Sequence, residues 1–255
     1  MKALPRRLGH GDEASLVDHL DELRGRLIVM LGALVLGTVV AFTVHGHILT
    51  WLERPLPLDR RQLVTLGVAE PFTVTLTLSI YAGFLLALPV ILWQLWGFFA
   101  PAVDPRAERR ARGLAVFAAV LGAVGLAFGY SILLPRAMHF LTTYDQAHFH
   151  ILIQAQAYFG FVSTVLLGVV CIFELPVVVL GLVHLGALTA AHLRKNRRLG
   201  YMIVAVIALG LPGPDPVTTA LELFPMLILF EGSIWLAVLT ERRAERLRAA
   251  MRVAG

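Results

Sequence analysis

Six stretches almost free of charged residues constrain the fold of this chain more than any other feature. A helix rises 1.5 Å per residue, so about 20 apolar residues are needed to cross a hydrocarbon core of about 30 Å. The stretches, broken only by three glutamates, are residues 27–44, 72–103, 113–135, 155–183, 199–211 and 217–240. With 58% apolar residues and a mean hydropathy of +0.76, the sequence predicts a single all-α, polytopic membrane domain over residues 1–255, with six transmembrane helices.

The last two of these helices are expected to be short and to form a hairpin. The fifth stretch, residues 199–211, reaches only about 20 Å as a helix. It is followed by "LPGPDPV" at 211–217, where three prolines and a glycine exclude a continuous helix. The sequence therefore predicts a turn between the fifth and sixth helices.

The distribution of positive charge predicts the orientation. Of the 22 Lys and Arg residues, 18 lie in the N-terminal segment, in the second and fourth loops and in the C-terminal segment. Cytoplasmic segments of membrane proteins carry an excess of these residues. Both termini are therefore expected in the cytoplasm, with residues 241–255 as a basic cytoplasmic tail, in a multi-pass protein of the cytoplasmic (inner) membrane.

Acidic residues also lie at this positive border. Glu22 and Arg26 are four residues apart and can form an ordinary surface ion pair on a helix. Glu108, in "DPRAERR" at 104–110, lies on the same predicted side, again among arginines. Two glutamates set beside bases can instead receive a pair of guanidinium groups through bidentate hydrogen bonds. The sequence pattern alone leaves both interpretations open.

Six motifs in order resemble one family. They are "HLDELRGRL" at 19–27, "PFTVTLTLSIYAGFLLALPVILWQLWGFFAPAV" at 71–103, "ERR" at 108–110, "FELP" at 173–176, "PD" at 214–215 and "LFEG" at 229–232. Together they resemble the successive signatures of TatC, the multi-span core subunit of the twin-arginine (Tat) protein translocase.

The resemblance implies a cupped, concave protein that binds twin-arginine signal peptides and exports folded proteins, driven by the protonmotive force. It implies the single-span subunits TatA and TatB as partners, and a homo-oligomer within the complex. The positions that match the signal-peptide site of the family are Glu22, Glu108, His19, Leu23, Arg24 and Phe98. Pro55 matches a proline of the first external loop of the family.

Glu174 lies near the centre of the predicted fourth span, and the family has a glutamate at this place. An acid inside the bilayer is costly and by default indicates a transport pathway. The alternative is a structural Glu174 that bonds to a backbone carbonyl freed by Pro176. Glu231 is a second intramembrane polar residue, without an assigned role. Partner-subunit contacts are expected near Asp215, Thr218 and Thr219; many family members have a glutamine where this chain has the two threonines.

Two other classes compete with the translocase. A small secondary transporter would use Glu174 as its ion- or proton-coupling carboxylate, whereas a scaffold would depend on no single glutamate. No HExxH or GxSxG motif and no nucleotide-binding loop occurs, so we expect no enzyme, no cofactor and no metal site. The net charge of +5 follows from membrane topology, and no nucleic-acid partner is expected.

Overall fold

The computed structural model describes residues 16–99, 107–144, 148, 151–210 and 216–253, and within these gives the backbone alone for 16–19, 59, 99, 107–111, 217 and 244–253. The described part is helical. Its α-helices are α1 (Leu16–Thr43), α2 (His45–Glu53), α3 (Glu70–Phe99), α4 (Ala107–Phe128), α5 (Leu134–Thr143), α6 (Ala155–Phe173), α7 (Leu175–His184), α8 (Ala190–Lys195), α9 (Arg197–Gly210) and α10 (Pro216–Val253). A 3-10 turn, η1 (Leu58–Arg60), follows α2, and a π-helical turn, η2 (Gly129–Leu133), joins α4 to α5.

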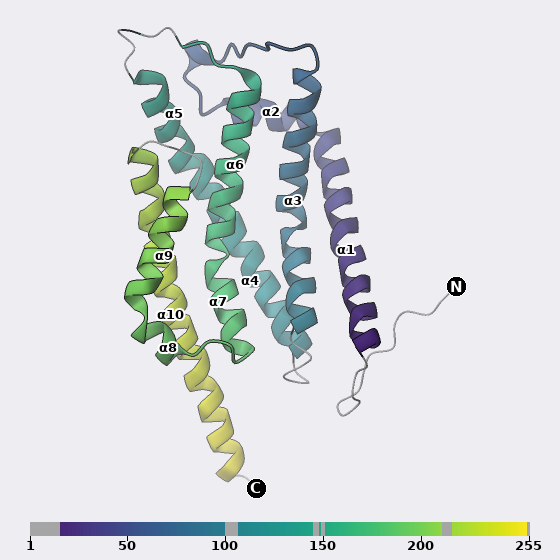
Figure 1. The fold of residues 1–255 in the computed structure, drawn as a ribbon, viewed down its shortest axis with the longest axis vertical. Helices are drawn as coiled ribbons and strands as arrows, with labels where there is room; N and C mark the ends of the chain where they lie inside the picture. The colour runs from purple at the N-terminus through teal and green to yellow at the C-terminus, as the bar shows by residue number, and fades with distance from the viewer. Residues whose placement is uncertain (1–15, 100–106, 145–147, 149–150, 211–215, 254–255) are drawn as a thin grey trace, which may run out of the picture.

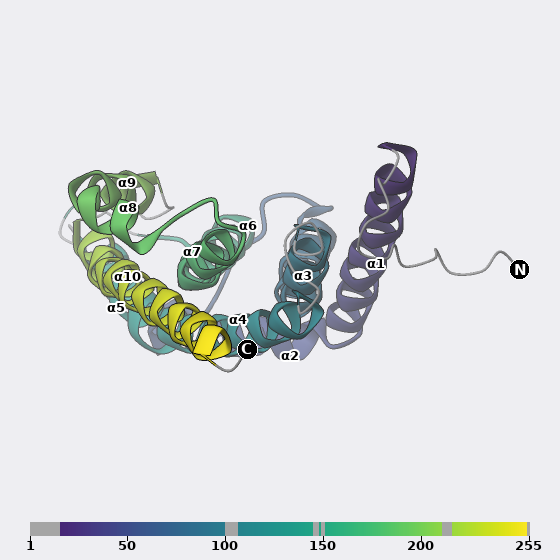
Figure 2. The ribbon, with the colours of Figure 1, turned by 90° about the horizontal axis from the view of Figure 1, so that it is seen from below.

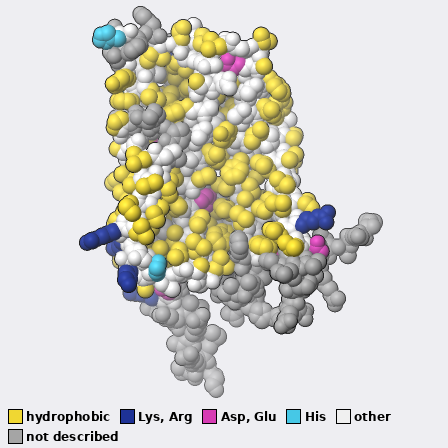
Figure 3. Space-filling model, in the orientation of Figure 1, with side chains coloured by type: hydrophobic (Ala, Val, Ile, Leu, Met, Phe, Trp, Pro, Cys, Tyr) yellow, Lys and Arg dark blue, Asp and Glu magenta, His cyan; other side chains and the backbone are white. Residues whose placement is uncertain are grey.

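Five helical segments are long and apolar enough to cross a membrane. They are Leu20–Thr43, Glu70–Phe98, Arg112–Thr143, Ala155–His184 and Thr218–Arg243. Hydrophobic side chains cover most of the visible surface, while Lys and Arg gather toward the lower end (Figure 3). The prediction of an all-helical, multi-pass membrane protein is confirmed; a count of six spans stays a prediction, since α9 has only 14 residues.

The last helix extends beyond its apolar part, through the basic segment for which the sequence predicts a helix or a solvated tail. α10 continues through the basic segment to Val253 and has 38 residues. Its apolar part ends near Thr240, but the residues that follow, "ERRAERLRAAMR", are mostly strong helix formers. Only α9 is therefore short in the C-terminal hairpin, and this hairpin does not reach as high as α3 and α6 (Figure 1).

The helices form a curved wall, with α1 at one edge and α9 at the other (Figure 2). We call the end at which α1 begins and α3 ends the near end, and the opposite end the far end. α6 and α7 continue one another through the middle of the wall, where α6 packs on α3 and α4, and α7 packs on α10 (Figures 1 and 2).

Small residues bring α1 and α3 into backbone contact. A Cβ atom placed on Gly37 would lie 2.6 Å from the carbonyl oxygen of Gly83, and one placed on Gly83 would lie 2.6 Å from Cα of Thr38. Ser79 and Ala87, one turn to either side of Gly83, are buried. Since lipid offers no hydrophobic gain for helix pairing, such close approach is a usual source of helix association in membranes.

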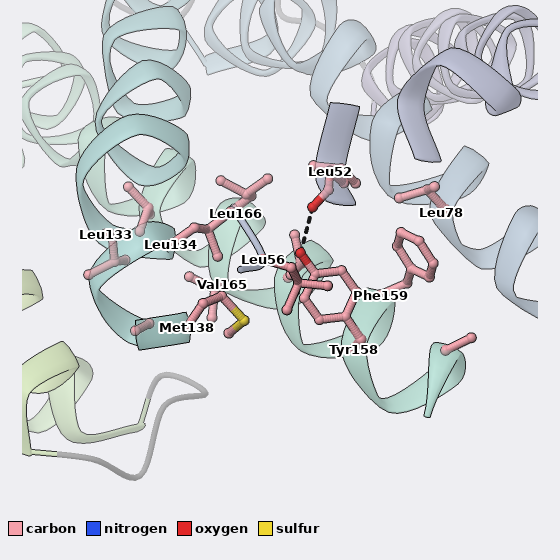
Figure 4. Packing of buried hydrophobic residues seen from close by; sticks show 14 of the residues in the cluster. Leu52, Leu56, Leu78, Leu133, Leu134, Met138, Tyr158, Phe159, Val165 and Leu166 are labelled. Carbon is pink, nitrogen blue, oxygen red and sulfur yellow. Dashed lines mark hydrogen bonds between the residues drawn. The ribbon is translucent and has the colours of Figure 1, made fainter. Parts of the chain in front are cut away.

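The far end holds the largest buried cluster, formed by α2, α3, η2, α5 and α6 (Figure 4). α2 lies across it and is held by two tyrosines. The Tyr158 hydroxyl donates to the carbonyl of Leu52 at 2.5 Å, and the Tyr130 hydroxyl donates to that of Trp51 at 2.8 Å. The bond from Tyr158 gives the Leu52 carbonyl, in the last turn of α2, an acceptor role that the helix end leaves open. The Trp51 carbonyl accepts from the backbone N–H of Arg54 as well as from Tyr130.

Glu70 joins the loop before α3 to the start of α6. Its Oε2 accepts hydrogen bonds from the backbone N–H groups of Leu66 (2.7 Å) and Gly67 (3.2 Å), and its Oε1 accepts one from Gln156 (3.0 Å). The side chain is buried. Beside it, the backbone of Val64 exchanges hydrogen bonds with Ile153 and Ala155. Two segments almost 90 residues apart are thereby held together at the far end.

Replacing Glu70 with alanine is expected to lower the free energy of unfolding by about 3 kcal/mol, because three backbone donors lose their acceptor. Glu70→Gln keeps one acceptor oxygen, so a smaller loss is expected. Thermal unfolding of the purified protein in detergent measures both changes. Equal stability of Glu70→Ala and wild type would show that these donors find other partners.

Candidate functional site

The near end of α1 carries a carboxylate that is fixed by an arginine. Nε and Nη2 of Arg26 both donate to Oε1 of Glu22, at 3.0 and 2.6 Å. The spacing of four residues places the two side chains on one face of α1. The Glu22 side chain is 32% exposed and that of Arg26 is 22% exposed. The ion pair predicted from the sequence is therefore present, at a partly accessible position.

The guanidinium of Arg26 also bonds to α3. Its Nη1 donates to the backbone carbonyl of Gln94 at 3.3 Å and to the side-chain Oε1 of Gln94 at 3.4 Å. Gly97 makes room for it, because a Cβ atom there would lie 3.3 Å from Cζ of Arg26 and closer still to Nη1. We call Glu22, Arg26, Gln94 and Gly97 the guanidinium clamp. Through the bonds of Arg26 to Gln94, the clamp links the near end of α1 to the near end of α3.

The other residues expected at the signal-peptide site lie around this clamp as far as they are described. Leu23 and Arg24 are exposed on α1, and Phe98 is half-buried in the last turn of α3. His19 lies in the first turn of α1 and Glu108 in the first turn of α4, both with undescribed side chains. The near ends of α1, α3 and α4 thus carry all six positions.

Glu174 lies at the junction of α6 and α7, in the middle of the membrane-length segment 155–184. Its side chain is only 4% exposed, and neither carboxylate oxygen has a hydrogen-bond partner in the described part of the chain. Oε1 lies against Gly122 of α4, 3.1 Å from the place of a Cβ atom there. The alternative in which Glu174 bonds to a carbonyl freed by Pro176 is therefore wrong, since no such bond forms.

Glu231 differs from Glu174 because it has two partners on α9. It accepts a hydrogen bond from the Tyr201 hydroxyl and forms an ion pair with Arg197 at 3.3 Å. These contacts hold α9 against α10, beside the packing of Phe230 on Gly200. Tyr201 and Arg197 lie about 30 residues before Glu231, and the helical pattern gave no signal for this pairing.

The residues expected to contact partner subunits are only partly described. Thr218 is fully buried and Thr219 half-buried at the start of α10, and both make polar contacts within the chain. Asp215 lies outside the described residues. Pro55 is half-buried directly after α2, next to the far-end cluster.

Sequence reasoning missed Gln94 and Gly97. Both lie inside a long apolar stretch, and a single glutamine among tryptophans was the only visible signal. Trp96, between them in sequence, points to another contact: it is buried against Gly181 of α7. Residues of the motif at 71–103 therefore contact two helices that neighbour α3: Gln94 and Gly97 contact α1, and Trp96 contacts α7.

These features define a multi-pass helical membrane protein with the guanidinium clamp at one end and, at mid-height, a buried carboxylate without a hydrogen-bond partner in the described part of the chain. Residues 18–225 match the sequence family described as Sec-independent protein translocase protein (TatC). This chain therefore belongs to the TatC family. It is accordingly a core subunit of the Tat protein translocase, and thus a transport protein.

Curated relatives and solved structures agree with this assignment. The chain is 35% identical to TatCd of Bacillus subtilis over 241 residues, which cover 93% of this chain and 97% of the relative. It is also 35% identical to the chloroplastic TATC protein of Arabidopsis thaliana over 237 residues, covering 90% of this chain and 68% of that protein. A crystal structure described as twin arginine translocase receptor TatC in DDM superposes with a TM-score of 0.76 at 32% identity, covering 86% of this chain and 99% of that one.

Proposed function

We propose that this chain is the twin-arginine signal-peptide receptor of its translocase, and that it exports folded proteins across the cytoplasmic membrane. The observation that carries the proposal is Glu22, a partly exposed carboxylate held in place by Arg26. A partly exposed carboxylate suits a planar guanidinium, which bonds through two parallel N–H groups, better than a lysine ammonium. The related crystal structure is itself described as a receptor.

In this proposal Glu22 and Glu108 each accept one arginine of the signal peptide. Leu23, Arg24, His19 and Phe98 form the surrounding surface at the near ends of α1 and α3. The near end then faces the cytoplasm. The far-end arginines fit this orientation because they satisfy backbone groups: Arg60 donates to the carbonyl of Ile151 at 3.0 Å. Arg61 donates to the carbonyls of Leu56 and Arg54 at 3.2 and 3.0 Å.

In this proposal Glu174 also takes part in transport, as a polar residue at mid-height along the path of the substrate. Its buried, unpaired carboxylate is costly for stability, and such groups persist in membrane proteins where they serve transport. We propose further that the chain forms oligomers and works with TatA and TatB near Asp215, Thr218 and Thr219. Export is then driven by the protonmotive force, in keeping with a sequence that contains no nucleotide-binding loop.

The receptor function is tested by binding a twin-arginine signal peptide and its Lys-Lys counterpart to the purified protein in detergent. Wild type is expected to prefer the Arg-Arg peptide by about tenfold or more, since each charge-assisted bidentate contact is directional. Glu22→Gln and Glu108→Gln are each expected to reduce this preference strongly. The matched control is Asp21→Asn, which removes an exposed acid from the same turn of α1. Equal loss in Asp21→Asn would indicate a general charge effect, and binding unchanged in both glutamate variants would contradict the proposal.

A further inference from the structure

Arg26 already supplies Glu22 with the contact that an incoming arginine would make. Both of its donors reach the same oxygen, Oε1 of Glu22, at 3.0 and 2.6 Å. A carboxylate oxygen offers about two lone-pair directions, so Oε1 is fully used. No described residue donates to Oε2 of Glu22. A ligand that takes both oxygens of Glu22 must therefore replace at least one bond from Arg26.

The position of Arg26 does not depend on Glu22 alone. Nη1 keeps two bonds to Gln94 on the neighbouring helix, and the absence of a side chain at Gly97 leaves space for the guanidinium. Arg26 can release Glu22 and still remain bonded to α3. Once released, the Glu22 carboxylate, whose side chain is 32% exposed, is accessible to a ligand at the near end.

We propose that Arg26 is a specificity-determining residue, an internal guanidinium that an incoming cation must displace from Glu22. This inference rests on the proposed receptor function. A ligand arginine replaces the lost bonds with two hydrogen bonds of the same kind, from a guanidinium to the carboxylate. The free energy of this exchange is therefore close to zero. A lysine ammonium is a compact and strongly hydrated charge that lacks the planar pair of N–H donors of a guanidinium. Its bonds to Glu22 therefore compensate only partly for the bonds that Arg26 loses. Arg26 thereby excludes lysine while it admits arginine.

The sign of the expected effect separates this role from a merely structural one. If Arg26 only supported the site, its loss would weaken the binding of both peptides. If Arg26 competes, Arg26→Gln leaves Glu22 as an open carboxylate that accepts either cation. The Lys-Lys peptide is then expected to bind about tenfold more tightly than to wild type, while the Arg-Arg peptide binds at least as well.

Two further variants keep the test independent of folding and of net charge. Gly97→Ala retains Arg26 but places a methyl group against its Nη1, so the guanidinium must leave its slot; a partial gain in Lys-Lys binding is expected. Arg198→Gln removes one exposed positive charge at the near end of α9, away from the clamp, and is expected to change neither affinity. Thermal unfolding of each variant shows whether the fold is retained.

The experiment measures the dissociation constants of the Arg-Arg and Lys-Lys peptides for wild type, Arg26→Gln, Gly97→Ala, Arg198→Gln and Glu22→Gln. A narrowed Arg-Arg to Lys-Lys ratio in Arg26→Gln through stronger Lys-Lys binding, absent in Arg198→Gln, supports the inference. An unchanged ratio in Arg26→Gln, or weaker binding of both peptides to the folded variant, overturns it while the receptor function stands. If Glu22→Gln binds both peptides as wild type does, the assignment of Glu22 in the receptor fails, and this inference fails with it.

Discussion

Replacing Glu174 with methionine is expected to make the protein more stable and less active. The carboxylate is buried, and neither oxygen has a hydrogen-bond partner among the described residues. It therefore contributes a desolvation cost that methionine, of similar length and without polar hydrogen-bonding needs, removes. We expect the free energy of unfolding to rise by about 1–3 kcal/mol. Export of a twin-arginine reporter is expected to fall at least about tenfold, a barrier change of about 1.4 kcal/mol.

The matched control for this prediction is Glu231→Met. Glu231 is also an acid in a membrane-length segment, but it accepts a hydrogen bond from Tyr201 and pairs with Arg197. Its loss leaves both partners without an acceptor, so stability should fall. Thermal unfolding in detergent and export from cells with equal membrane levels measure the two effects. A Glu174→Met protein that is less stable than wild type would contradict the unpaired state of this carboxylate, and undiminished export would remove it from the transport path.

Gly83→Ala is expected to separate α1 from α3. The added methyl group would lie 2.6 Å from Cα of Thr38, and this contact is with backbone, so no side-chain rotation relieves it. We expect a loss of about 3 kcal/mol in unfolding free energy, at the upper end for an overpacked contact. Since Glu22 and Arg26 lie on α1 and Gln94 on α3, binding of the twin-arginine peptide should be lost as well.

Gly32→Ala provides the comparison for Gly83→Ala. Gly32 lies on α1 with nothing within 4 Å of an added Cβ atom, so the same substitution should be neutral or slightly stabilising there. Thermal unfolding and peptide binding are measured for both variants. If both behave alike, the close approach of α1 and α3 at Gly83 does not contribute to the site.

The sequence predicted those parts of the molecule that depend on local pattern. The apolar stretches around residues 72–103 and 155–183 indicated long helices, and α3, α6 and α7 lie there. The spacing of Glu22 and Arg26 predicted their pair, because positions four apart share a face of a helix. Glu174 was placed at mid-membrane simply by counting residues along the apolar stretch.

The parts that depend on contacts between distant segments could not be predicted. Gln94 meets Arg26 from 68 positions away, and no helical period relates them. Gly83 is one of several small residues in an apolar stretch, and only the crossing of two helices gives it importance. Glu231 carried no assigned role because its partners lie on α9. Hydropathy ends at Thr240 and could not decide between a helix and a solvated tail for the basic segment; α10 continues through it because helix propensity continues.

The bonds of Glu70 have a consequence for the order in which the protein is made. Its Oε1 and the backbone of Val64 bond to residues 153–156, which the ribosome adds almost 90 positions later. At a synthesis rate of about 5–20 residues per second, roughly 5–20 s pass before these partners exist. During that interval α3 has been made while the loop before it lacks these bonds, so the loop acquires them only after the start of α6 has been made. A newly made chain therefore completes the packing of the far end after α1, α2 and α3 have been made.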